Sequence, residues 1–170
     1  MHLIIDGYNL LYCGRTQIKM NQIELQWERD RLINQLSNYR KRKPSEMIVV
    51  FDGWLGGWST EKREREKGID LIFSKLGEKA DEVIKRLVGE KGSGVWVITS
   101  DRDISKYAER MGVPVIPSEQ FRKKMESPAI TVQNRYKEEE EEKGEGVKKK
   151  GPSRRLSKKE KRLRAALKKV

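Results

Sequence analysis

Aspartates follow several apolar runs of this 170-residue sequence at or near the point where each run ends. Asp6 follows LII and Asp52 follows VVF directly, and Asp101 follows VIT after one serine. If these runs are parallel strands, their carboxyl ends meet at one edge of the sheet, where open α/β folds bind ligands. Carboxylates gathered there are tolerated when a cation lies between them. The pattern predicts a metal site.

A further aspartate, Asp81, belongs to a predicted helix. Asp81 shares a helical face with Ile84 and Val88, so we expect it to point toward the sheet edge, whereas Glu82 faces solvent. Each aspartate taken alone is also a common turn or cap residue. The predicted catalytic set is Asp6, Asp52, Asp81 and Asp101, and the expected direct metal ligands are Asp6, Asp81 and Asp101.

Polar neighbours complete the predicted site. Asn9 and Ser100 are expected to hold a carboxylate or phosphate oxygen, although Asn9 is equally typical of a turn. Asp103 is expected either to cap the helix that follows or to support the metal site. Oxygen ligands favour one or two Mg²⁺ or Mn²⁺ ions. Zinc is improbable because the chain has one histidine, His2, and one cysteine, Cys13.

The chemistry expected of such a site is in-line hydrolysis of a phosphodiester. The glycine-rich segment 89–95 lacks the spacing and the lysine of a phosphate-binding P-loop. Tyr8 occupies the position at which a phosphatase with an aspartyl nucleophile would usually carry a second aspartate. A metal-dependent phosphatase is therefore a less favoured alternative.

Strand-like and helix-like segments alternate along the chain. The expected strands are 2–5, 47–51, 69–73, 95–99 and 113–116, and the expected helices are 22–42, 78–89, 104–111 and 118–125. Ser118 is expected to cap the last helix. This alternation predicts the α/β class, with a mostly parallel sheet covered by helices on both faces.

A glycine-rich loop, residues 53–68, begins directly after Asp52. Its aromatic residues, Trp54 and Trp58, could stack on unpaired bases or pack in the core, and its basic residues could bind phosphates. Those basic residues are Lys62, Arg63 and Arg65. Two other tryptophans, Trp27 and Trp96, lie in periodic segments and are expected in the core.

The composition changes after Pro128, which predicts a folded domain over 1–127 and a charged, mostly flexible tail over 128–170. Residues 143–170 hold thirteen Lys or Arg and two Glu, which is most of the formal net charge of +12. A basic helix is expected at 157–169. An electrostatic arm for RNA is the favoured role of the tail, through Lys148, Lys149, Lys150, Arg154 and Arg155. The alternatives are that the tail docks on a protein, that it lies on an anionic membrane, or that it is simply solvated.

The expected location is cytoplasmic. A single cysteine fits a reducing compartment, and the N-terminus lacks the features of a signal peptide. No apolar run approaches the roughly 18 residues that span a membrane. We therefore expect no membrane-spanning segment.

Several separated motifs resemble the bacterial YacP-like NYN domain, a branch of the PIN-like metal-dependent nucleases. They are DGYN, VVFDG, KADEVIKRLV, VITSDRDISKYAERMGVPVI and SEQF, within residues 1–126. The resemblance implies a three-layer PIN-like fold with strand order 3-2-1-4-5 and RNA endonuclease activity. Its acidic positions map onto Asp6, Asp52, Asp81 and Asp101, and some members act on ribosome-associated RNA or mRNA. We predict a Mg²⁺- or Mn²⁺-dependent ribonuclease; a non-catalytic RNA- or ribosome-binding module is the alternative.

Overall fold

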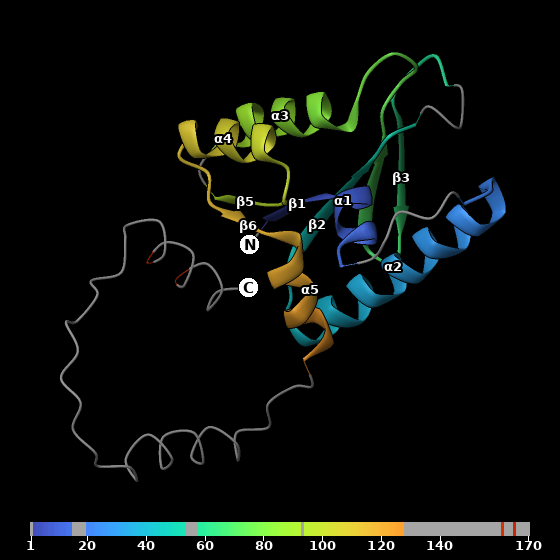
Figure 1. Ribbon diagram of the computed structural model, residues 1–170, viewed down its shortest axis with the longest axis horizontal. Coiled ribbons are helices and arrows are strands. Elements are labelled where there is room, and N and C mark those ends of the chain that lie inside the picture. Colours follow the sequence, from blue (N-terminus) through green and yellow to red (C-terminus); the bar gives the residue numbers. More distant parts are fainter. Residues whose placement is uncertain are drawn as a thin grey trace, which may run out of the picture.

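Six strands form one sheet and alternate along the chain with helices in the computed structural model (Figure 1). The structure describes residues 2–14, 20–53, 58–92 and 94–127 together with Lys161 and Ala165. The sheet order is β3-β4-β2-β1-β5-β6. The strands are β1 (His2–Asp6), β2 (Glu46–Phe51), β3 (Lys62–Glu66), β4 (Ile69–Phe73), β5 (Val95–Ile98) and β6 (Val115–Ile116). The helices are α1 (Gly7–Tyr12), α2 (Gln22–Arg42), α3 (Ala80–Lys91), α4 (Arg102–Arg110) and α5 (Ser118–Glu126).

The predicted α/β class and PIN-like architecture are confirmed. The expected order 3-2-1-4-5 corresponds to β4-β2-β1-β5-β6, in which all neighbours are parallel. The structure adds β3, which pairs antiparallel with β4 at one edge of the sheet. The strand order therefore differs from the prediction by this one edge strand.

Helices cover both faces of the sheet because successive strand residues point to opposite sides. Leu3 and Ile5 pack in a buried cluster with residues of α1, α2 and α5, whereas Ile4 packs in a second cluster with residues of α3 and α4. Figure 1 shows α3 and α4 on one side of the sheet and α2 and α5 on the other. The two apolar layers hold the carboxyl ends of β1, β2 and β5 at a common edge.

Two elements lie where only turns or loops were expected. The short helix α1 begins directly after β1, and its N-cap is Asp6, whose side chain accepts a hydrogen bond from the Asn9 N–H. In the predicted loop 53–68, Lys62–Glu66 is a strand joined to β4 by a turn in which Lys67 and Gly68 both have positive φ angles, 50° and 79°. Turns of this kind match the twist of a two-stranded hairpin.

The expected core position of Trp27 is wrong. Trp27 is 71% exposed, because it lies on the side of α2 opposite to the buried Leu25 and Leu32. Trp96 is partly buried and packs against the core, as expected. Among the described helices, none combines the length and the apolar character that crossing a membrane requires.

Candidate acidic site at the carboxyl edge of the sheet

Asp6 is the most buried of the predicted site residues, with 7% of its surface exposed. Its Oδ1 accepts a hydrogen bond from the Asn9 N–H at 3.1 Å, and its Oδ2 accepts one from the Thr99 hydroxyl at 3.0 Å. The pKa of Asp6 is raised from 3.8 to about 6, mainly by burial; the negative charges of Asp81 and Asp101 add to the rise and the two hydrogen bonds oppose it. The charged form of the Asp6 carboxylate, at the end of β1, is therefore disfavoured by its burial.

Asp101 lies next to Asp6 through a shared threonine. The Thr99 hydroxyl that donates to Asp6 accepts a hydrogen bond from the Asp101 N–H at 3.1 Å. Asp101 is also the N-cap of α4, because its Oδ1 accepts from the Asp103 and Ile104 N–H groups at 2.8 and 3.0 Å. The alternative in which Asp103 caps this helix is therefore wrong, and Asp103 is an exposed first-turn residue.

Asp52 connects the end of β2 to the start of α3. Its Oδ1 accepts a hydrogen bond from the Ala80 N–H at 2.7 Å, whereas the N-cap residue Lys79 makes no side-chain cap bond. Asp52 therefore satisfies the helix terminus that presents Asp81. Asp81 is half-buried and Glu82 is exposed. Burial raises the pKa of Asp81, and the charges of Asp101 and Asp52 add to the rise while Lys85 opposes it.

The oxygens that remain for a cation come from three of these carboxylates. Oδ2 of Asp52 and of Asp101 has no hydrogen bond to the described residues, and neither has the Asp81 carboxylate. These hard oxygen donors suit Mg²⁺ or Mn²⁺. Among the described residues, no group of three or more His, Cys, Asp or Glu side chains is close enough together to hold an ion. Binding would require the side chains to rotate toward one another.

Asn9 and Ser100 lie together beside the aspartates. The Asn9 Oδ1 accepts hydrogen bonds from the Ser100 N–H at 2.9 Å and from the Ser118 hydroxyl at 2.7 Å. Ser118 begins α5 but does not cap it, so the expected cap role is wrong. Thr99 and Ser118 were not predicted as site residues. The sequence signals that could have indicated them are the hydroxyl of Thr99 at a predicted strand end and the serine of the SEQF motif, Ser118.

The loop residues predicted to bind RNA are only partly described. Trp58 is half-buried against Phe73, with ring centroids 5.4 Å apart, and Lys62 Nζ lies 4.6 Å from the Trp58 ring centroid. Lys62, Arg63 and Arg65 belong to β3 and form ion pairs with Glu64, Glu61 and Asp70, respectively. Trp54 and the tail residues Lys148, Lys149, Lys150, Arg154 and Arg155 lie outside the described residues, as does most of the predicted helix 157–169.

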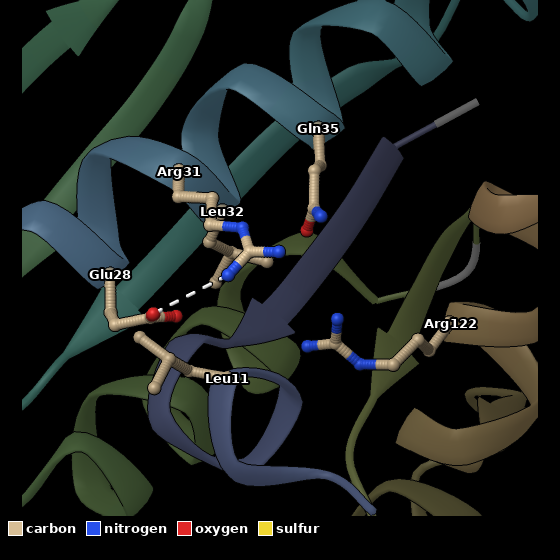
Figure 2. Close-up of a pocket in the computed structure, with 6 residues that line it drawn as sticks. All are labelled: Leu11, Glu28, Arg31, Leu32, Gln35 and Arg122. Atoms are coloured by element: carbon tan, nitrogen blue, oxygen red, sulfur yellow. Dashed lines mark ion pairs between the residues drawn. The ribbon is translucent and has the colours of Figure 1, made fainter.

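A pocket between α1, α2 and α5 is separate from the aspartates (Figure 2). It is lined by Leu11, Glu28, Arg31, Leu32, Gln35 and Arg122. Arg31 lies 3.5 Å from Glu28 on the same helix, and Arg122 enters from α5. Because none of the predicted acidic residues lines this pocket, it is not part of the acidic site.

Gly53→Ala is expected to destabilise the site edge. The Gly53 N–H donates to the Ser74 hydroxyl, and an added Cβ would lie 2.0 Å from the Ser74 carbonyl oxygen. Overpacking of this kind costs roughly 1–3 kcal/mol and occasionally more. Urea unfolding should show the loss. In the matched control Gly89→Ala, within α3, the new Cβ makes only an ordinary 3.5 Å contact with the Tyr107 hydroxyl of α4, so stability should rise. Equal stability of Gly53→Ala and the parent protein would contradict the close approach.

The sequence matches the profile of the YacP-like NYN domain over residues 3–165. A curated relative, the uncharacterized protein YacP of Bacillus subtilis (strain 168), is 33% identical over 104 residues. The aligned segment makes up 58% of this chain and 59% of the relative. The match thus spans less than two thirds of that protein.

Two crystal structures of Rae1 (YacP) from Bacillus subtilis have a similar fold. A single-substitution mutant gives a TM-score of 0.61 at 22% identity, with 83% of this chain and 82% of that chain covered. A second structure gives a TM-score of 0.59 at 25% identity, with 84% and 83% covered.

Proposed function

Because the chain belongs to the YacP-like NYN domain family, we propose that it is a Mg²⁺- or Mn²⁺-dependent ribonuclease that cuts RNA internally at the acidic edge of the sheet. The observation that supports this most is the proximity of Asp81 and Asp101 to the buried Asp6, whose pKa is raised mainly by burial and further by these two negative charges. A structural role alone does not require two further carboxylates near a buried aspartate. Strongly perturbed acids of this kind are typical of functional sites.

The aspartates have different roles in this proposal. Oδ2 of Asp101 and the Asp81 carboxylate have no hydrogen bond to the described residues and, with Asp6, would hold one or two ions. The bound ions would activate a water and stabilise charge on the leaving oxygen. Asp52 holds the start of α3 through the Ala80 N–H and thereby positions Asp81. Thr99 donates to Asp6 and accepts from the Asp101 N–H, which sets the separation of these two residues.

RNA is the proposed substrate, with ribosome-associated mRNA as its proposed form and the cytoplasm as the proposed location. The basic tail would neutralise phosphates without choosing a sequence. The Trp58 indole packs against Phe73 and Lys62, which favours the core-packing alternative over base stacking for this residue.

The proposal is tested by incubating the purified protein with a single-stranded RNA labelled at one end. We expect internal cuts with Mg²⁺ or Mn²⁺ and their loss when EDTA is added, because the carboxylates need the ion to act on the phosphodiester. A duplex DNA and a small phosphomonoester serve as control substrates.

The alternatives predict different results in the same experiment. A non-catalytic RNA- or ribosome-binding module would retain the RNA uncut at every metal concentration. A phosphatase would hydrolyse the phosphomonoester and leave the RNA intact. Either result would contradict the proposed ribonuclease.

A further inference from the structure

Ser118 is fully buried, and its hydroxyl contacts a predicted site residue far away in the sequence. The hydroxyl donates to Asn9 Oδ1 at 2.7 Å, and the Ser118 N–H donates to Ser100 Oγ at 3.1 Å. The Ser100 N–H in turn donates to the same Asn9 oxygen at 2.9 Å. Residues of α1, of the segment between β5 and α4, and of α5 are thus joined at one point.

The two hydrogen bonds decide which way the Asn9 amide faces. A backbone N–H can only donate, so the Asn9 atom that meets Ser100 must be the carbonyl oxygen and not the nitrogen. The Asn9 Nδ2 therefore points away from Ser100, on the opposite side of Cγ from Oδ1, and it has no acceptor among the described residues. The Asn9 side chain thus keeps two N–H donors without an acceptor among the described residues, and its backbone N–H donates to Asp6 at 3.1 Å.

A free donor pair on a residue that is hydrogen-bonded to Asp6 suits a phosphate oxygen. The amide nitrogen of asparagine is not a metal ligand, since it has no available lone pair, whereas it can donate to the oxygens of a phosphodiester. We propose that Ser118 is a positioning residue, which fixes the Asn9 amide so that its NH₂ group donates to a phosphate oxygen of bound RNA. This inference rests on the proposed ribonuclease function.

A role in helix stability does not explain the Ser118 hydroxyl. The N-cap of α5 is Pro117, and no side-chain cap bond is made there. The hydroxyl leaves its own helix and bonds to Asn9, 109 positions away. Its loss should change the orientation of Asn9 more than the stability of α5.

The test compares Ser118→Ala, Ser118→Thr and the control Ser127→Ala, whose serine donates to Lys123 O at the exposed end of the same helix. Single-turnover cleavage by Ser118→Ala should be roughly tenfold slower, the scale of one lost positioning hydrogen bond, with little change in RNA affinity. Ser118→Thr retains the hydroxyl and should restore most of the rate, and Ser127→Ala should behave as the parent protein.

A double-mutant cycle separates positioning from general damage. In an Asn9→Ala background, Ser118→Ala should have little further effect, because the amide that it positions is already absent. An equal loss of rate in both backgrounds, or a normal rate in Ser118→Ala, would overturn the proposal.

A measurement without catalysis keeps this inference distinct from the proposed function. The ¹⁵N order parameter of the Asn9 side-chain amide should be high in the parent protein and in Ser127→Ala, and should fall below about 0.6 in Ser118→Ala. An unchanged order parameter would overturn the positioning role even if the protein cleaves RNA. If the parent protein does not cleave RNA but the order parameter falls, the proposed function fails while the fixed amide stands.

Discussion

Asp101→Asn is expected to slow RNA cleavage at least about a hundredfold while the protein stays folded, the scale of losing one charge-stabilising group in an active site. Asparagine retains the Oδ1 that accepts from the Asp103 and Ile104 N–H groups, and it is as good an N-cap as aspartate. The negative charge and the second carboxylate oxygen are lost. The substitution therefore separates the metal-binding role of Asp101 from its role as a helix cap.

The matched control is Asp103→Asn, which removes one carboxylate two residues away. Asp103 is exposed, and its side chain makes no hydrogen bond to the described residues, so its loss should change the rate little. Thermal unfolding of both variants should resemble that of the parent protein. Unchanged cleavage by Asp101→Asn would remove this residue from the proposed site.

Asp6→Asn is expected to stabilise the metal-free protein at pH 7 and to abolish its activity. The folded-state pKa of Asp6 is raised to about 6 from 3.8, mainly by burial, so the folded state binds the proton more tightly than the unfolded state. Stability therefore falls as the pH rises from about 4 to 6 and is constant above. At pH 7 the buried charge lowers the free energy of unfolding by about 3 kcal/mol, at 1.36 kcal/mol for each pKa unit.

Urea unfolding in EDTA at pH 4, 5.5 and 7 measures this cost. The stability gain of Asp6→Asn over the parent protein should be near zero at pH 4 and should approach its maximum at pH 7. The variant retains an acceptor for the Asn9 N–H, and the Thr99 hydroxyl can turn to accept from the new amide. Mg²⁺ should stabilise the parent protein more than the variant. A gain that is the same at every pH would contradict the raised pKa.

The elements that sequence reasoning placed correctly are those with a buried apolar face. The bounds of α2 and β4 agree with their predicted ranges because each has apolar residues at a regular spacing. β3 has no such signal, since its sequence is KRERE and its pairing with β4 depends on backbone hydrogen bonds and the turn at Lys67 and Gly68. α1 was missed because Gly7 and Asn9 are typical of turns.

The acidic positions could be predicted because each follows an apolar run, whereas their supporting contacts could not. The bond between Asn9 and Ser118 joins residues 109 positions apart, and nothing local in either segment indicates it. Asp52 was expected to serve catalysis, but the structure gives it a second task, at the first N–H of α3. Contacts of this kind depend on how the helices dock on the sheet.

The two edges of the sheet bear on how the protein avoids self-association. An exposed edge strand offers unpaired N–H and C=O groups to another chain, and charged or very short edge strands discourage this. β3 consists wholly of Lys, Arg and Glu residues, and the opposite edge, β6, has two residues. The β3 side chains form ion pairs with Glu64 and Asp70, and a second chain that added to this edge would lie directly beside this row of charged residues. The wholly charged sequence that left β3 without a strand signal thus also makes this edge a poor template for pairing with another chain.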